Sequence, residues 1–238
     1  MILFFIPSYN DHELVSSLAE SLLQNHPEAE LLVIDDGSVV PVVLSVSPAL
    51  EGRVRLYRLE TNAGLGMATS IAIDYFLQGP QQVLVRVDAD GEHPLSEVTK
   101  LYKPVLDGAA DMVWAERVIA NASQSARAGA ASALRSRAKS LTRWIAQRAM
   151  GCNHTDWFSG FFAMGRDAAQ RFQADHLERY CEVQMLCLAF ARRQRLQTVV
   201  VTQIQRAHGQ SSIRLFGGLM VVLRAWLLIL VHATSRTR

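Results

Sequence analysis

Three carboxylates at alternating positions are the residues whose spacing most clearly suggests chemistry. Asp88, Asp90 and Glu92 follow the largely apolar run 83–87, which has the character of a buried strand. If the backbone stays extended there, all three side chains point the same way, and their like charges need a cation between them. Oxygen ligands favour Mg²⁺ or Mn²⁺, which usually complete their shell with substrate phosphates. The stretch therefore predicts a metal site that takes a nucleotide diphosphate.

Other interpretations of such residues fit less well. A calcium-binding loop also begins with Asp-x-Asp-Gly, but it requires Gly at its sixth position and Glu at its twelfth, where this chain has His93 and Thr99. A plain solvated turn stays open as the alternative. Cys152, His154 and Asp156 also alternate, but no second pair of ligands supports zinc. The carboxylate cluster is therefore the main candidate site.

The length and cysteine content of the chain limit the classes of protein to consider. Its 238 residues suffice for one large α/β domain with a full core. Three cysteines without a CxxC pair fit reduced thiols better than a disulfide framework. Met1 leads directly into the apolar run 2–6, without the basic leader of a signal peptide. We therefore expect a cytoplasmic protein.

The two halves of the chain carry opposite charge. Residues 1–116 contain 17 acidic and 6 basic residues, whereas residues 117–238 contain 5 acidic and 18 basic residues. No acidic residue occurs in 118–155 or in 183–238. A basic half of this kind suits anionic lipid, nucleic acid or another phosphate-bearing partner. Simple neutralisation of the acidic half by the basic half is the alternative.

The elements that must position the carboxylates alternate between strands and helices. Apolar runs predict strands at residues 2–6, 31–34, 53–59, 83–87 and 111–115, and start signals predict helices from Asn10 and from Pro94. This order with short joints predicts a parallel sheet with right-handed crossovers. Carboxylates that follow such strands lie where open α/β sheets bind ligands. Asp36 is therefore a candidate for hydrogen-bonding a base or ribose.

A glycine-rich loop at residues 62–68 follows the third predicted strand. Its Gly64 and Gly66 resemble part of a dinucleotide fingerprint, but Thr69 stands where the last glycine belongs, and the fingerprint normally follows the first strand. A Rossmann dehydrogenase is therefore disfavoured. We expect the loop to let the backbone approach a nucleotide, with helix packing as the alternative.

Two segments of the second half suggest contact with a membrane surface. Residues 127–150 have the pattern of a basic amphipathic helix, with Arg or Lys at intervals of four on one face. Residues 215–233 are almost wholly apolar, and the uncharged runs on either side of Arg224 are too short to span a bilayer. This second segment either lies flat in the interface or packs against protein, and both interpretations stay open.

Four motifs taken together resemble family 2 glycosyltransferases of GT-A fold. Each motif is weak alone, but four in this order and at fitting separations are specific. They are Ile6-Pro7-Ser8-Tyr9-Asn10, Val33-Ile34-Asp35-Asp36-Gly37-Ser38, Asn62-Ala63-Gly64-Leu65-Gly66 and Asp88-Ala89-Asp90-Gly91-Glu92-His93-Pro94. The resemblance implies an α/β fold with a mostly parallel central sheet flanked by helices, and a nucleotide-diphosphate sugar as donor. The implied donor contacts are Pro7, Tyr9, Asn10, Asp36, Gly64 and Asp88.

The second half narrows this resemblance to polyprenyl-phosphate and dolichyl-phosphate sugar transferases. Residues 156–164 contain an Asp-x-x-Ser-Gly-Phe signature similar to theirs, and residues 206–212 resemble their Arg, Gly, Ser loop near the donor phosphates. The implied metal ligands, for Mg²⁺ or Mn²⁺, are Asp88, Asp90 and Glu92, with Asp90 also catalytic. The implied phosphate contacts and closing residues are Arg117, Arg137, Arg206 and Ser211.

The same resemblance implies how the chain is organised. A GT-A domain would cover residues 1–214, with a donor-nucleotide half at 1–116 and an acceptor half at 117–214, and an apolar, interfacial helix would follow at 215–238. Three features depart from the family pattern: Ser212 replaces a common lysine, Glu92 replaces a frequent glutamine, and no transmembrane pair follows the domain. A neighbouring arginine, Arg214, is a candidate replacement for the missing lysine.

The expected reaction is inverting transfer of a sugar to a polyprenyl phosphate at the inner membrane face, by a protein in peripheral contact with anionic lipid. A phosphate acceptor is largely ionised at neutral pH and needs no general base. The alternative is a family 2 enzyme that acts on a sugar hydroxyl or another soluble acceptor. That reaction would need a base, and Asp156, Glu178 and Glu182 are the candidates.

Two other classes fit the sequence less well. A nucleotidyltransferase normally has a Gly-rich basic loop after its first strand, where this chain has Pro-Ser-Tyr-Asn at residues 7–10. A non-catalytic nucleic-acid-binding protein would explain the arginines but not the carboxylates, and Trp144 alone does not make an aromatic platform. We therefore expect no nucleic-acid partner.

Overall fold

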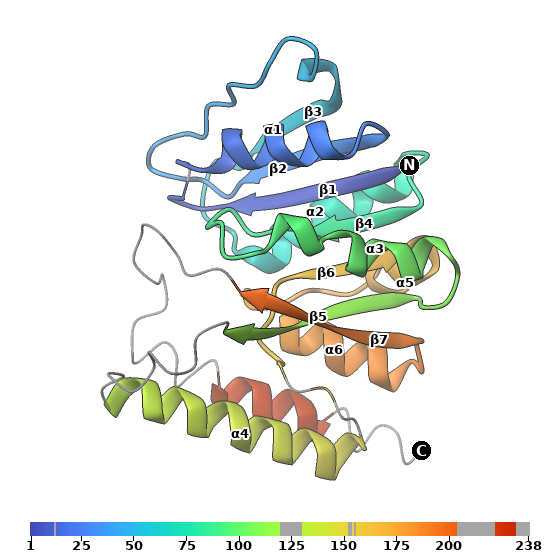
Figure 1. Cartoon of the computed structure of the whole chain (residues 1–238). Helices are drawn as coiled ribbons and strands as arrows, with labels where there is room; N and C mark the ends of the chain where they lie inside the picture. The colour runs from blue at the N-terminus through green and yellow to red at the C-terminus, as the bar shows by residue number, and fades with distance from the viewer. Residues whose placement is uncertain (12, 120–129, 152–153, 155, 204–221, 232–238) are drawn as a thin grey trace.

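The computed structural model describes residues 1–11, 13–119, 130–151, 154, 156–203 and 222–231. Its centre is a seven-stranded sheet in the order β3-β2-β1-β4-β6-β5-β7 (Figure 1). Most neighbouring strands are parallel, and β6 runs antiparallel to both β4 and β5. The strands are β1 (Ile2–Ser8), β2 (Ala29–Asp35), β3 (Val54–Arg58), β4 (Val83–Arg86), β5 (Met112–Ile119), β6 (Phe162–Gly165) and β7 (Leu196–Gln203).

Helices cover both faces of this sheet (Figure 1). One face carries α1 and α3, and the other carries α2, α5 and α6. Their bounds are α1 (Val15–Asn25), α2 (Leu65–Gln78), α3 (Thr99–Leu106), α5 (Arg166–Gln173) and α6 (Glu182–Ala191). Side chains of a strand alternate between the two faces, so Phe4 joins the core under α1 whereas Phe5 joins the core under α2. The expected α/β architecture, a mostly parallel central sheet flanked by helices, is confirmed.

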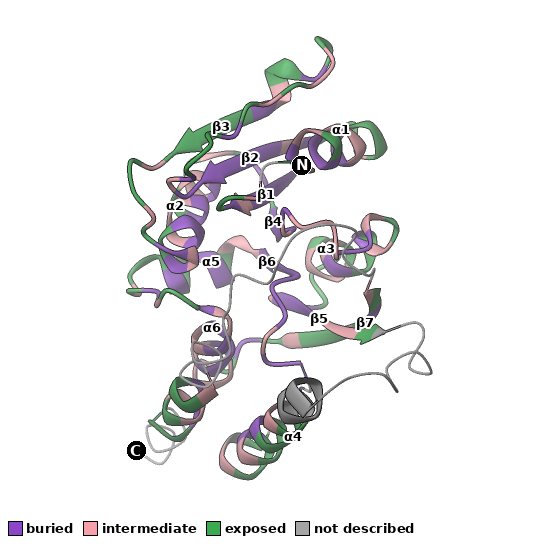
Figure 2. Cartoon of the chain, turned by 90° about the vertical axis from the view of Figure 1, so that its left-hand side faces the viewer, coloured by how far each residue is buried: buried purple, intermediate pink, exposed green. Residues whose placement is uncertain are grey.

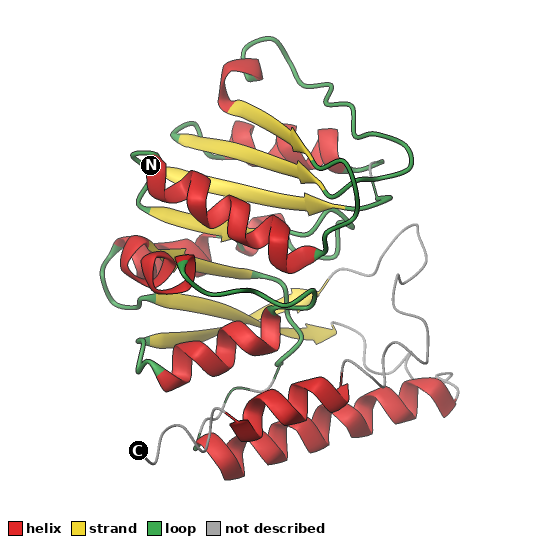
Figure 3. Cartoon of the chain, turned by 180° about the vertical axis from the view of Figure 1, so that it is seen from behind, coloured by secondary structure: helices red, strands yellow, loops and turns green. Residues whose placement is uncertain are grey.

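A further pair of helices lies below the sheet (Figures 1 and 3). One is α4 (Ala130–Met150), and the other is formed by residues 222–231. The indole Nε1 of Trp226 donates a hydrogen bond of 2.9 Å to the Oγ1 of Thr142 and so joins the two helices. Ala225 and Ile229 are buried in the core that also contains α6. Part of the apolar segment therefore packs against the domain, and no described helix is long and apolar enough to cross a membrane.

Several expected boundaries differ from those observed. The helix expected from Asn10 begins at Val15, because Asn10 has a positive φ of 54° and its side chain is used in a loop contact. The helix expected from Pro94 begins at Thr99, after a short 3₁₀ turn. Strand β5 extends to Ile119, beyond the end expected at residue 115; the division into a donor half and an acceptor half stays a prediction. Cys181 and Cys187 are both buried, and neither is part of a disulfide.

Candidate functional site

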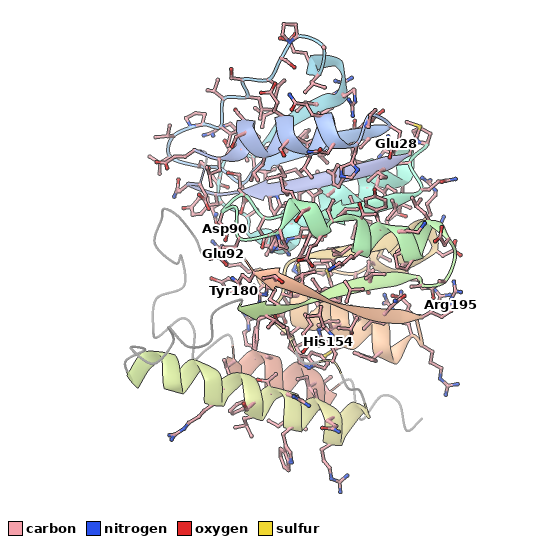
Figure 4. The ribbon with its side chains drawn as sticks, viewed as in Figure 1. Glu28, Asp90, Glu92, His154, Tyr180 and Arg195 are labelled. Atoms are coloured by element: carbon pink, nitrogen blue, oxygen red, sulfur yellow. The ribbon has the colours of Figure 1, made fainter. Side chains whose placement is uncertain are left out.

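The polar motifs of the sequence gather at one edge of the sheet. Strands β1, β2 and β4 run parallel, so the segments that follow them emerge on the same side. Figure 4 shows Asp90 and Glu92 at that side, where the strand arrowheads point, with Tyr180 also on that side and Glu28 and Arg195 at the opposite edge. The carboxylates Asp90 and Glu92 therefore lie at the sheet edge where they were expected, and their function stays a prediction. The register of the sheet also places the ends of β1 and β2 side by side, because Ser8 pairs with Asp35 in these adjacent strands.

The loops after β1 and β2 are tied to each other. The Asn10 side-chain carbonyl accepts a hydrogen bond of 2.9 Å from the Val39 amide, and the Asn10 amide donates one of 2.9 Å to Ser38 Oγ. Buried Asp35 accepts hydrogen bonds from the amide of Ser38 and from the guanidinium of Arg58. Burial alone raises the pKa of Asp35, but these hydrogen bonds outweigh burial and leave the pKa below its usual range. These contacts fix the positions of the two loops relative to each other.

Asp36 holds the glycine-rich loop in place. Its carboxylate accepts hydrogen bonds of 2.7 Å from the Ala63 amide, 2.8 Å from the Gly64 amide and 3.1 Å from the Asn62 side chain. Gly64 has φ +95°, and a Cβ there would lie 2.6 Å from the Cγ of Arg179, so glycine is required on both counts. Asp36 is only 4% exposed. Its observed role is to shape the loop, and a contact with a base stays a prediction.

Pro7 and Tyr9 lie beside these loops at the end of β1. Pro7 is within the strand and pairs with Ile34. Tyr9 follows the strand, and its side chain is 42% exposed. Its ring is therefore accessible to a ligand at this edge, as a donor contact requires.

The end of β4 differs from the extended backbone that the sequence suggested. The strand stops at Arg86, residues 89–91 form a turn, and Gly91 has φ +73°. The carboxylates of Asp88 and Asp90 therefore enter different surroundings. Asp88 Oδ1 accepts a hydrogen bond of 2.8 Å from Arg86 Nε, so a guanidinium offsets part of its charge; its role as a metal ligand stays a prediction.

Arg86 is the centre of a buried ion-pair network. Its guanidinium also contacts Glu182 Oε1 at 3.2 Å and lies over the ring of Phe162. Burial disfavours the charged forms, but the ion pair outweighs burial and holds the pKa of Asp88 below its usual range. Glu182, the first residue of α6, is thus part of the support beneath Asp88.

His93 and Gly160 complete the surroundings of Asp88. The Asp88 amide donates a hydrogen bond of 3.0 Å to His93 Nδ1, so Nε2 carries the proton and faces Asp88 Oδ2 at 3.5 Å. The imidazole stacks on Phe161 with ring centroids 4.4 Å apart, and burial lowers its pKa. A Cβ at Gly160 would lie 2.6 Å from Asp88 Oδ2. The Ser-Gly-Phe signature is therefore explained by close packing against this network.

Asp90 and Glu92 lie in the turn, where they are partly exposed. Asp90 Oδ1 accepts a hydrogen bond of 3.0 Å from the Glu92 amide, and Glu92 Oε2 accepts one of 2.5 Å from Gln203. The described residues contain no cluster of three or more His, Cys, Asp or Glu that would enclose a metal on their own. Mg²⁺ and Mn²⁺ commonly take one or two carboxylates and complete their shell with water and phosphate. The oxygen donors of this turn fit that kind of ion.

Arg117 and Asp156 form a second ion pair. Arg117 Nε donates a hydrogen bond of 2.7 Å to Asp156 Oδ2, and Nη2 donates one of 3.0 Å to Oδ1. This two-point contact neutralises both carboxylate oxygens. Although burial opposes it, the ion pair raises the pKa of Arg117. The backbone oxygen of Asp156 faces Nε2 of His154, whose pKa is lowered by burial.

The remaining predicted site residues lie farther from the carboxylates or outside the described part of the chain. Arg137 is exposed on α4, whose amino-terminal end points to the same side as the strand ends in Figure 1. Arg206 and Ser211 lie outside the described residues. A hollow of about 90 Å³ separates the start of α6 from helix 222–231; its lining includes Phe158, Tyr180, Glu182, Arg224 and Leu228.

Sequence reasoning missed Arg86 and His93 as parts of the site. The signal for Arg86 was a single basic residue in an apolar strand, two positions before Asp88 and therefore on the same side of the strand. Glu182 was a candidate base, but no local signal indicated that it pairs with Arg86, because the two residues are 96 positions apart in the sequence. The pairing became visible only when β4 and α6 were placed together.

The fold and the site define a GT-A glycosyltransferase. Residues 4–175 match the family model described as glycosyl transferase family 2, and the chain belongs to this family. Among solved structures, glucosyl-3-phosphoglycerate synthase of Mycobacterium tuberculosis, in complex with Mn²⁺, UDP-glucose and phosphoglyceric acid, aligns with a TM-score of 0.67 at 17% identity. That alignment covers 98% of this chain and 80% of the other.

Several curated relatives within the family are named for polyprenyl or dolichyl acceptors. Polyprenol monophosphomannose synthase of Mycolicibacterium smegmatis is 32% identical over 120 residues, which are 49% of this chain and 45% of that protein. Undecaprenyl-phosphate mannosyltransferase of Micrococcus luteus is 27% identical over 224 residues, which are 92% of this chain and 89% of that protein. The first three curated relatives are matched over only about half of their length. The resemblance to polyprenyl-phosphate sugar transferases is thus confirmed at the level of related proteins.

Proposed function

We propose that this protein transfers a sugar from a nucleotide-diphosphate sugar to a polyprenyl phosphate at the cytoplasmic face of the membrane. The observation that supports this proposal is that the carboxylates considered as general bases are engaged in ion pairs. Asp156 is held at two points by Arg117, Glu182 is paired with buried Arg86, and Glu178 Oε2 lies 3.9 Å from Arg224 Nε. A carboxylate engaged in this way is poorly suited to remove a proton. An acceptor that needs no base fits this arrangement better than a hydroxyl does.

The donor would lie over the loops at the strand ends. Tyr9, Asn10 and the loop held by Asp36 would contact the nucleotide, and Arg86 with His93 would keep Asp88 in place beside it. Asp90, assisted by Glu92, would hold Mg²⁺ or Mn²⁺. The ion would supply positive charge to the leaving diphosphate. The crystallised relative with Mn²⁺ and UDP-glucose supports a divalent ion in this class of site.

The acceptor phosphate would be bound by basic residues of the second half. Arg117 and Arg137 are the proposed contacts, with Arg206 and Ser211 closing the site. Because the second pKa of a phosphate monoester is about 6, the acceptor carries its nucleophilic oxygen already ionised at neutral pH. That oxygen would attack the anomeric carbon as the bond to the diphosphate breaks. The electron pair leaves with the nucleoside diphosphate, the configuration inverts, and no proton needs to move.

A two-phase transfer assay tests this function. Purified protein is incubated with labelled nucleotide sugars, polyprenyl phosphate in detergent, and Mg²⁺ or Mn²⁺, and label is counted in the organic phase. We expect labelled lipid that disappears with a chelator and falls by about 100-fold or more in Asp90→Asn, as for loss of a charge-stabilising group. Asp107→Asn is the matched control, because that carboxylate is 58% exposed at the end of α3. Donor hydrolysis without labelled lipid would refute the lipid acceptor and favour a hydroxyl acceptor.

A further inference from the structure

The helix formed by residues 222–231 exposes an apolar side. Ala225 and Ile229 are buried against the domain, whereas Leu223, Leu227 and Leu230 are 46%, 63% and 51% exposed. At 100° per residue, positions 223, 227 and 230 form one stripe on the side turned away from Ala225. A helix that is apolar on both sides needs a partner for each side. Within the described part of the chain, the domain supplies only one of them.

The neighbouring helix α4 exposes a stripe with a different composition. Thr142 and Ala146 face inward and are fully buried, whereas Leu141 and Trp144 are 41% and 61% exposed. Positions 137, 141, 144 and 148 recur at helical spacing, so Arg137 and Arg148 flank these two apolar residues. Figure 2 shows that α4 carries exposed surface at the bottom of the molecule, below the buried strands. The stripe thus combines an aromatic ring with arginines at both ends.

We infer that these two helices dock on an anionic membrane surface through an apolar face made of Leu141, Trp144, Leu223, Leu227, Leu230 and Val231. Exposed apolar side chains of this number mark an interaction site. The charge of the helices identifies the partner: Arg137, Arg143 and Arg148 of α4 are exposed, and neither helix contains an acidic residue. Arginine beside tryptophan and leucine suits the boundary between headgroups and acyl chains.

The biological role of this membrane contact rests on the proposed function. The contact itself can be tested without donor or acceptor. The hollow lined by Tyr180 and Glu182 is bounded on its other side by Arg224 and Leu228 of helix 222–231. One side of this helix would therefore face the site while the opposite side faces the lipid. A polyprenyl phosphate held in the membrane would then meet the site without leaving the bilayer.

The test is vesicle binding by the full chain in the absence of donor and acceptor. Vesicles of phosphatidylcholine with phosphatidylglycerol should sediment the protein, and pure phosphatidylcholine should sediment much less. We expect Trp144→Gln with Leu227→Gln to weaken binding by about tenfold or more, because each exposed apolar side chain contributes to insertion. Arg143→Gln with Arg148→Gln should weaken it by about fivefold for each arginine removed, and added salt should have the same effect.

Matched controls and a spectroscopic signal make the result specific. Val43→Gln with Leu56→Gln removes two other exposed apolar side chains, 78% and 41% exposed, and should leave binding unchanged. Tryptophan fluorescence should shift to the blue on binding and lose most of this shift in Trp144→Gln, because Trp114 and Trp157 are already buried and Trp226 is half-buried against Thr142.

Three outcomes overturn the inference: absence of vesicle binding, equal binding to neutral vesicles, or a dimer in light scattering that the Trp144 and Leu227 substitutions dissociate. The last outcome would assign the apolar face to a second copy of the chain. If the protein does not bind vesicles but still transfers sugar in detergent, the inferred membrane-binding surface is wrong and the proposed function stands. Vesicle binding without any lipid labelling would instead overturn the proposed function.

Discussion

Replacing Gly160 by alanine would place a methyl group against the buried ion pair. The added Cβ would lie 2.5 Å from Arg86 Nη2 and 2.6 Å from Asp88 Oδ2, whereas ordinary contacts begin at 3.4 Å. One or both groups must therefore move by about 0.9 Å, the difference between 3.4 and 2.5 Å. Arg86 cannot simply swing away, because it is 3% exposed and is held by two carboxylates.

The size of the effect follows from this displacement. Overpacking of a well-packed interior costs about 1–3 kcal/mol, which leaves a domain with about 5–15 kcal/mol of stability folded. A shift of about 1 Å in a positioned group can reduce the rate by up to about 100-fold. We therefore expect Gly160→Ala to lose much more activity than stability.

Urea unfolding and the lipid-transfer assay measure the two effects separately. Gly52→Ala is the matched control, because a Cβ there meets nothing within 4 Å, and it should be neutral in both measurements. Wild-type activity in Gly160→Ala would refute the role assigned to the Arg86 and Asp88 pair. If activity falls only in proportion to the amount of folded protein, the Arg86 and Asp88 pair contributes to stability and not to positioning in the site.

Three further changes test other parts of the site. Asp156→Asn keeps an acceptor for Arg117 but removes the charge, so transfer to polyprenyl phosphate should fall about tenfold without vanishing; complete loss in a folded variant would contradict a base-free mechanism. Asp36→Ala leaves the amides of Ala63 and Gly64 without their acceptor. It should lower the free energy of unfolding by about 2 kcal/mol or more and raise the KM for the donor; an unchanged KM would argue against a donor loop. Burial holds the pKa of His154 below its ordinary value. The unfolded chain therefore takes up this proton first as the pH falls through about 6.5. Stability should be full above that pH and decline below it, and unfolding at several pH values should show a smaller decline in His154→Gln.

Much of the fold could be predicted because its signals are local. The order of strands and helices up to Asp111 followed from apolar runs and turn residues, and parallel pairing then placed the polar motifs at one edge of the sheet. The turn after β4 was not predictable in the same way. Strand ends depend on hydrogen bonds from the neighbouring strands, and Gly91 adopts a positive φ that ends the extended backbone.

The roles of individual side chains depended on distant partners. Alternation suggested that Asp88 and Asp90 share one metal, which stays a prediction, but it could not show that buried Arg86 also pairs with Asp88. Composition could not decide whether the segment from Leu215 lies in the membrane interface or packs against protein. The described helix 222–231 shows why: Ala225 and Ile229 pack against the domain, while the opposite side of the helix is exposed.

The central claim is that the acceptor is a phosphate whose ionised oxygen needs no base. The most direct measurement compares transfer by the wild-type protein to polyprenyl phosphate and to the polyprenol of the same chain length, with the same donor and metal. The account predicts label in the polyprenyl phosphate and none above background in the alcohol. Label in the alcohol at a comparable rate would contradict it and would assign a catalytic base to Asp156 or Glu182.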